Sequence, residues 1–425
     1  MKKLLISATI SSILLATGCT EQASTMNKTA TTQTDSVKAE QSNPLFMTSS
    51  LTYGAPQFDL IKDEHFIPAF EKGMEQHLQE VEKIASNPDA PTFDNTLLAL
   101  EKSGSLLTRT SRVFFNLVGT DSSPERREIQ KILAPKLAAH SDTINLNSAL
   151  FKRIETLYNQ RDELELDTES TRLLEVYYSD FVRAGAKLNE SDKQKIREIN
   201  EEHSTLTTQF SQNLLAESSE IAVVVNDVEQ LSGMSERQIK AASDAAKAAD
   251  KEGKYLLSIT NTTRQPVLTS LENRALRQQV WEASAYRNQS GEYDNTKIIS
   301  RLAGLRAQKA ALLGFDSWAA YSLDKQMAGS PSAVYDMLGS MVPAVLKNVE
   351  KEAADIKAMI EAEGNNFELK PWDWAFYAEK VRQAKYELDE NEVKQYFEFN
   401  RVLEDGVFFT MNKLYGVRFK PRPDL

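Results

Sequence analysis

Apolar residues recur at every third or fourth position along most of the chain, which is the spacing of one face of an α-helix. The clearest runs cover residues 64–84 and 191–216. Another helix is expected to begin near residues 91–95 (PTFDN). Ser191 is the expected N-cap of the second run, because Asp192 behind it suits the positive end of a helix. No sequence repeat of about 20 to 50 residues is found, which favours an irregular helical array over a solenoid.

One stretch departs from the helical pattern. Residues 221–225 (IAVVV) are rich in β-branched side chains, and residues 255–260 (YLLSIT) form a second strand candidate. Between them, Ser235 is expected to open an alanine-rich helix that runs to about Asp250. The predicted fold is therefore mostly α, with a small β element near residues 221–260.

The C-terminal residues predict a last amphipathic helix over 399–414, which Gly416 would end. Residues 417–419 (VRF) then favour a short strand. A strand of that length needs a neighbouring strand, yet the sequence ends at Leu425. We expect this end to be a severed part of a longer protein.

Composition narrows the class of protein. The 425 residues carry a net charge of −11, which disfavours a nucleic-acid partner because phosphate binding needs a clustered cationic face. Gly (16) and Pro (13) are scarce, as expected for long helices and not for a many-stranded sandwich. The balance of hydrophobic (41%) and charged (26%) residues is that of a globular protein.

The first 50 residues read as an export signal followed by a tether. A basic start precedes about a dozen apolar residues, too few to span a bilayer, so residues 1–18 are predicted to be a signal peptide. The segment before Cys19, the only cysteine, resembles a bacterial lipobox, which implies lipidation of Cys19 and a membrane anchor on the periplasmic side. The residue after the cysteine is Thr20 and not Asp, which by resemblance to enterobacterial lipoprotein sorting favours the outer membrane. An ordinary signal peptide with an incidental cysteine is the alternative. Residues 19–50 form the predicted flexible linker.

Candidate catalytic groups are few. The four histidines, at positions 65, 77, 140 and 203, form no His-Glu-x-x-His pair of the kind that binds zinc. His77 with Glu80 is interpreted as a solvated helix pair, and His203 as a packed core histidine. No serine-hydrolase elbow or phosphate-binding glycine loop is present. The aromatic segment 371–377 (PWDWAFY) is interpreted either as a helix start packed into the core or as the wall of a ligand groove.

Several segments, in order along the chain, resemble the zinc metallopeptidases of the thimet-oligopeptidase family. They are 51–61 (LTYGAPQFDLI), 91–96 (PTFDNT), 261–266 (NTTRQP), 312–315 (LLGF), 371–374 (PWDW), 377–380 (YAEK) and 400–406 (NRVLEDG). The Tyr53-Gly54-Ala55-Pro56 start favours the bacterial peptidyl-dipeptidase (dipeptidyl carboxypeptidase) branch. The resemblance runs from about Leu51 to Phe419.

This resemblance implies a helical protein around a narrow channel that admits short unfolded peptides. In the family, a His-Glu-x-x-His helix and a later Glu bind one zinc ion, which activates water with the motif Glu as base. That motif lies C-terminal to the region resembled, so no catalytic or zinc-binding residue can be placed on positions 1–425. Residues 51–425 are then expected to be the N-terminal helical part of a metallopeptidase, inactive alone.

Two functions remain open from the sequence. The first is a part of an exported, lipid-anchored zinc peptidase that removes dipeptides from the C-terminus of short peptides. The second is a helical lipoprotein that binds peptides or partners without cutting them.

Overall fold

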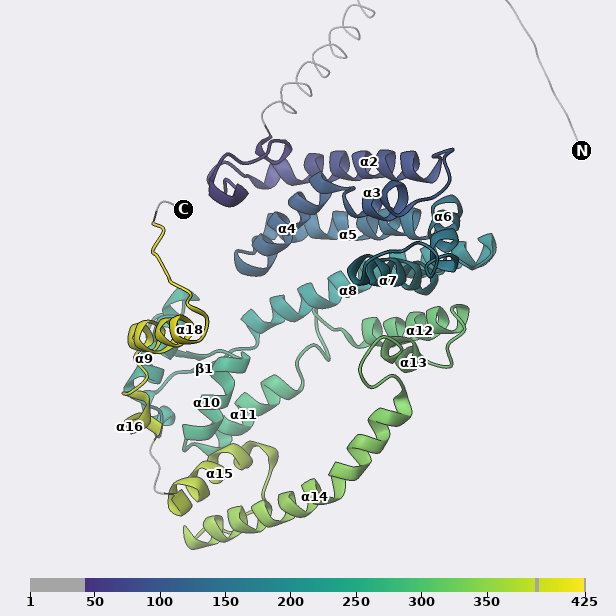
Figure 1. The fold of residues 1–425 in the computed structure, drawn as a ribbon. Coiled ribbons are helices and arrows are strands. Elements are labelled where there is room, and N and C mark those ends of the chain that lie inside the picture. Colours follow the sequence, from purple (N-terminus) through teal and green to yellow (C-terminus); the bar gives the residue numbers. More distant parts are fainter. Residues whose placement is uncertain (1–42, 387–389, 424–425) are drawn as a thin grey trace, which may run out of the picture. The chain divides into compact units, whose positions relative to one another are not determined.

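A computed structural model describes residues 43–386 and 390–423, and helices dominate them (Figure 1). The predicted signal peptide, Cys19 and most of the linker lie outside the described residues. The chain divides into two compact units. The first comprises Met1–Ile84 and Leu98–Ile129, and the second comprises Ala85–Leu97 and Gln130–Leu425. The mostly-α prediction is confirmed.

Unit 1 is built on two long helices. These are α2 (Phe66–Ala85) and α4 (Ser105–Thr120), and the short α3 (Ala99–Glu101) precedes α4. Phe114 of α4 packs edge-on against Phe66 and Phe70 of α2, with ring centroids 4.9 and 5.5 Å apart. All three rings are fully buried. The apolar face predicted over residues 64–84 is therefore the face that forms this core. Single helical turns cover Pro44–Phe46, Thr52–Gly54 and Asp63–His65.

The loop between α2 and α4 is fixed by polar contacts. His77 Nε2 lies 3.1 Å from Ser103 Oγ, and the Gly104 N–H donates to Glu80 Oε2 over 2.7 Å. Gly104 adopts φ +69°, and a Cβ there would come within 2.8 Å of the His77 ring, so glycine is required on both counts. Glu80 is exposed, as expected for a solvated pair, whereas His77 is half-buried. Both side chains also contact the chain that enters α4.

Helix α5 (Pro124–Asn145) and a π-helical turn (Phe93–Leu98) cross the division between the units. The remaining long elements belong to unit 2. They are α6 (Ser148–Asn159), α7 (Thr168–Ala184), α8 (Glu190–Glu220), α9 (Glu236–Ala248), α10 (Asn261–Ser270), α11 (Arg274–Ala285), α12 (Thr296–Leu312), α13 (Trp318–Leu323), α14 (Pro331–Ala362) and α15 (Pro371–Tyr386). Helix α16 (Glu390–Lys394) follows.

The predicted strand–helix–strand element is present in unit 2. Strand β1 (Val223–Val225) pairs antiparallel with β2 (Tyr255–Leu257), with Val224 opposite Leu256. Helix α9 lies between them in sequence, and the Ser235 side chain accepts from the Gln238 N–H as its N-cap. A buried cluster joins the sheet to α10 and α11 through Leu231, Leu271 and Val280. The prediction is confirmed in its order and in its capping residue.

Two predictions about element ends are wrong. Helix α8 begins two residues earlier than expected, because the cap is Asn189, whose side chain accepts from the Asp192 N–H, and not Ser191. Residues 417–419 are not a strand. In the described residues the two strands of the sheet pair with each other, and 417–419 has no ladder partner. Phe419 instead stacks on Phe408 with centroids 4.1 Å apart.

The predicted C-terminal helix is present over 399–415, as α17 (Phe399–Arg401), a π-helical stretch (Val402–Phe408) and α18 (Phe409–Tyr415). Gly416 ends it in a left-handed conformation, as expected. Within the described ranges, no helix is long and apolar enough to cross a membrane.

Helix α14 leaves much of its apolar surface exposed. Its buried residues in the described part of the chain are Ile356 and Ile360, near its C-terminal end, which pack against Phe376 and Tyr377 of α15. Figure 1 shows α14 and α15 side by side. The exposed apolar side chains of α14 are Tyr335, Met337, Leu338, Met341, Val342, Val345, Leu346 and Val349. A contiguous surface of this kind marks an interface.

Candidate functional site

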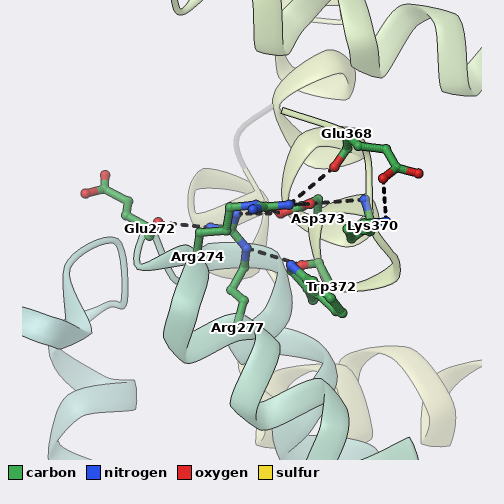
Figure 2. Close-up of polar contacts among 7 residues, drawn as sticks. All are labelled: Glu272, Arg274, Arg277, Glu368, Lys370, Trp372 and Asp373. Atoms are coloured by element: carbon green, nitrogen blue, oxygen red, sulfur yellow. Dashed lines mark hydrogen bonds and ion pairs between the residues drawn. The ribbon is translucent and has the colours of Figure 1, made fainter. Parts of the chain in front are cut away.

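The aromatic segment that opens α15 contains a buried carboxylate, Asp373, which lies beside Arg274 and Arg277 (Figure 2). Asp373 is fully buried and accepts hydrogen bonds from two arginines of α11. Arg274 Nε and Nη2 donate to Oδ1 and Oδ2 over 2.9 and 2.8 Å, and Arg277 Nη2 donates to Oδ1 over 3.1 Å. Oδ2 also accepts from the Lys370 N–H over 3.1 Å, which satisfies a donor ahead of the helix.

Arg277 is almost as buried as Asp373, with 1% of its surface exposed. Its remaining donors bind the carbonyl oxygens of Leu271 and Glu272 over 2.8 and 3.0 Å, and that of Trp372 over 3.2 Å. Burial lowers the pKa of Arg277, and the hydrogen bond to Asp373 acts in the opposite direction. The network joins α11 to α15 and holds the first turn of α15 in place.

A groove lies between α9, α10 and α15, with a volume of 1140 Å³. Phe376, Glu379 and Lys380 of α15 line one side, and Thr262, Thr263, Gln265 and Thr269 of α10 line another. Both interpretations of the 371–377 segment therefore hold in part. Asp373 and Tyr377 pack into the core, whereas Phe376 belongs to the core and also lines the groove.

The groove offers hydrogen bonds and apolar contact more than reactive groups. Its two lining carboxylates are engaged, since Glu272 Oε2 accepts from Ser232 Oγ over 2.6 Å and Glu379 accepts two bonds of 2.7 Å from Arg382. No histidine or cysteine is among the residues that line it in the described part of the chain. The groove therefore presents hydroxyl, amide and apolar groups, and the Thr263 and Thr269 hydroxyls already donate to the Ser258 and Gln265 carbonyl oxygens.

None of the four histidines is among the residues that line the groove. His65 Nδ1 accepts from the Lys62 N–H over 3.0 Å in unit 1, where His77 also lies. His140 is buried on α5. His203 on α8 is only half-buried, so its interpretation as a packed core histidine is wrong. Its Nε2 accepts from Arg306 Nε over 3.3 Å, and burial, with smaller contributions from Arg306 and Lys309, lowers its pKa.

Several polar residues were missed from the sequence. Arg274 and Arg277 stand three residues apart on α11, a spacing that places both on one helix face. The sequence could therefore have predicted a pair of neighbouring positive charges there. Their shared partner, Asp373, lies about a hundred residues further along the chain and gave no such signal. A second polar group, Asp142, Asn200 and Lys309, comes from α5, α8 and α12 and had no sequence signature.

Comparison with known proteins finds similarity to a peptidase family. Residues 267–425 match the model of peptidase family M3, a family of zinc metallopeptidases. The resemblance to the thimet-oligopeptidase family, predicted from the sequence, is therefore confirmed.

Similarity to individual proteins extends over nearly the whole chain. The chain is 44% identical over 384 residues to the dipeptidyl carboxypeptidase of Escherichia coli (strain K12), and 42% identical to that of Salmonella typhimurium. It is 30% identical over 388 residues to oligopeptidase A of Escherichia coli. Each alignment covers 90% of this chain and 56% of the relative. The chain thus spans about half the length of the curated relatives it matches.

The described residues do not fit a zinc ion. Zinc in proteins takes three or more ligands from His, Cys, Asp and Glu. No group of three such side chains in 43–386 and 390–423 is placed to hold a metal. No zinc ligand is therefore assigned to the described residues.

Proposed function

We propose that this chain is a segment of an M3 metallopeptidase that removes dipeptides from the C-terminus of short peptides. The observation that carries the proposal is the 44% identity to a dipeptidyl carboxypeptidase over 90% of the chain, together with the match of residues 267–425 to the family. The lower identity to oligopeptidase A supports an enzyme that acts at the end of a peptide over one that acts inside it.

In this proposal the described residues supply scaffold and peptide contacts, and polypeptide outside positions 1–425 supplies the zinc ligands. The sequence 1–425 contains no His-Glu-x-x-His, and the chain spans 56% of its relatives. The groove beside α15 is the candidate surface for the peptide, since its threonines and Gln265 can hydrogen-bond to an extended backbone.

The exposed apolar surfaces also support the proposal that further polypeptide, outside positions 1–425, supplies the zinc ligands. On α14, Leu346 is 56% exposed, and on the last helix Phe399 and Leu414 are 74% and 66% exposed. Each such side chain gains about 1.5–3 kcal/mol when it is fully buried. A domain that packed on these faces would gain a large part of its association energy from them. We assign that role to the part of the enzyme that holds zinc.

A chimera tests the proposal. Residues 51–425 replace the matching segment of the Escherichia coli dipeptidyl carboxypeptidase, and the relative supplies the rest of its own chain. We expect release of C-terminal dipeptides from an N-blocked tetrapeptide, abolished by a chelator and restored by zinc. The unmodified relative, purified in parallel, is the control. A chimera that melts cooperatively and binds zinc yet releases no dipeptide would contradict the proposal.

A further inference from the structure

The exposed apolar side chains of α14 include a row with heptad spacing. Steps of three and four residues alternate between its five members, which are Tyr335, Leu338, Val342, Val345 and Val349. Such residues occupy the a and d positions of a heptad and lie on one face of the helix. Each of them is between 40% and 74% exposed, so no described residue covers this row, which we call the α14 seam.

The α14 seam continues a face of the helix that is already packed at its other end. Ile356 follows Val349 by seven residues and therefore stands at the next a position. Ile356 and Ile360 are each 1% exposed, because α15 packs on them. Figure 1 shows α15 beside the C-terminal part of α14. One helix thus covers the end of this face, and the rest of the same face is open.

The spacing of the seam fits an α-helix as its partner. Side chains at a and d positions insert between the side chains of a neighbouring helix that crosses at about 20°. From Tyr335 to Val349 the seam is about 21 Å long, at a rise of about 1.5 Å per residue. A partner helix of about four turns would cover it.

The residues beside the seam disfavour a second copy of this chain as the partner. In two-stranded coiled coils, the e and g positions often carry charged residues that pair between the helices. The e and g positions of the seam are uncharged and hold Gly339, Met341, Leu346 and Asn348. Met341 and Leu346 are exposed and widen the apolar stripe, which is typical of a helix that packs inside a multi-helix core.

The relatives indicate where such a core would come from. This chain covers 56% of the Escherichia coli dipeptidyl carboxypeptidase, so more than two fifths of that relative has no counterpart in positions 1–425. We propose that the α14 seam is covered by one amphipathic helix of the polypeptide that completes the peptidase. This inference rests on the proposed function, and it adds the surface that is used and the secondary structure of its partner.

Cysteine labelling tests the proposal in the chimera of residues 51–425 with the Escherichia coli relative. Residues 51–425 contain no cysteine, so Val342→Cys and Val345→Cys each place a single thiol of this chain on the seam. Lys347→Cys is the matched control, because position 347 is exposed and lies on the opposite side of α14. Each variant is made both in the chimera and in the purified chain 1–425, and peptide mass spectrometry measures the rate of maleimide labelling at that position.

The expected result is protection of one helix face in the chimera. In the purified chain the three thiols should react at similar rates, since all three positions are exposed. In the chimera the thiols at 342 and 345 should react at least about tenfold more slowly than in the purified chain, and the thiol at 347 within about twofold. The two seam variants are independent, so one that fails to fold leaves the other to decide.

Three results would overturn the proposal. The first is labelling at 342 and 345 that is as fast in a cooperatively melting chimera as in the purified chain. The second is equal protection at 347, because one helix cannot cover both sides of α14. The third is protection of the seam in the purified chain that disappears on dilution, which would assign the seam to a second copy.

Dipeptide release, assayed on the same chimera, separates this inference from the proposed function. An active chimera with an accessible seam would overturn the inference and leave the proposed function standing. An inactive chimera with a protected seam would support the inference and contradict the proposed function.

Discussion

Replacing Asp373 by Asn tests the buried network that fixes α15. The substitution keeps the shape of the side chain but removes its negative charge. Arg277, 1% exposed, would then be a buried cation without a counterion, and Arg274 would lose the carboxylate charge and one of its two bonds to this side chain. Breaking a buried ion pair by removing one partner costs about 3–5 kcal/mol, a large share of a typical stability of about 5–15 kcal/mol.

The magnitude follows from the contacts. Asp373 accepts three side-chain bonds from two guanidinium groups, at 2.8 to 3.1 Å, and a hydrogen bond to a charged group contributes about 1.5–3 kcal/mol. The Asn amide can keep one oxygen as acceptor, while its NH₂ group faces a donor. A loss of about 3 kcal/mol or more is therefore expected.

Urea denaturation, followed by tryptophan fluorescence, measures the change in the free energy of unfolding with a probe close to the substituted site. Three of the four tryptophans, Trp281, Trp372 and Trp374, lie on α11 and the first turn of α15, and the first two rings are 5.9 Å apart. Asp244→Asn is the control, because Asp244 pairs with Lys240 on an exposed helix face and should change stability by less than about 0.5 kcal/mol. The reasoning is refuted if Asp373→Asn shifts stability by no more than this control does.

Three further predictions concern the cap of α8, the histidines and the N-terminus. Asn189→Ala should cost about 1 kcal/mol by thermal melting, whereas Ser191→Ala should cost much less; equal effects would contradict the cap. Burial lowers the pKa of His203 and of His77 in the fold, so their contribution to stability is complete above the unfolded pKa of about 6.5 and is lost as the pH falls through the folded pKa. His203→Gln should therefore lessen the drop in Tm between about pH 7.5 and pH 5, and an unchanged drop would refute this. Mass spectrometry of the N-terminal peptide should find acyl chains on Cys19 that Cys19→Ala lacks, and an intact thiol in a soluble periplasmic protein would contradict the lipobox.

The sequence predicted best where local signals agreed. Ser235 and the alanine-rich run behind it identify α9, because an N-cap and helix propensity are both properties of neighbouring residues. The β-branched run at 221–225 identifies β1 in the same way. One error arose where two good caps, Asn189 and Ser191, lie two residues apart, because residue preference alone does not choose between them.

Long-range partners could not be predicted. The segment 417–419 has strand propensity, but a strand forms only with a neighbour, and propensity says nothing about the neighbour. The pairing of Arg277 with Asp373, and the hydrogen bonds of Asn200 to Asp142 and to Lys309, both depend on how helices pack. The resemblance to the family, in contrast, could be predicted from short motifs such as 371–374, which lie within the matched region.

The central claim is that residues 1–425 carry peptide contacts and scaffold while the zinc ligands come from elsewhere. The most direct measurement is the zinc content of the purified chain, determined by mass spectrometry after dialysis against zinc, with hydrolysis of a blocked tetrapeptide assayed on the same sample. The account predicts substoichiometric zinc and no release of a C-terminal dipeptide. One zinc ion per chain, with dipeptide release that a chelator abolishes, would contradict it.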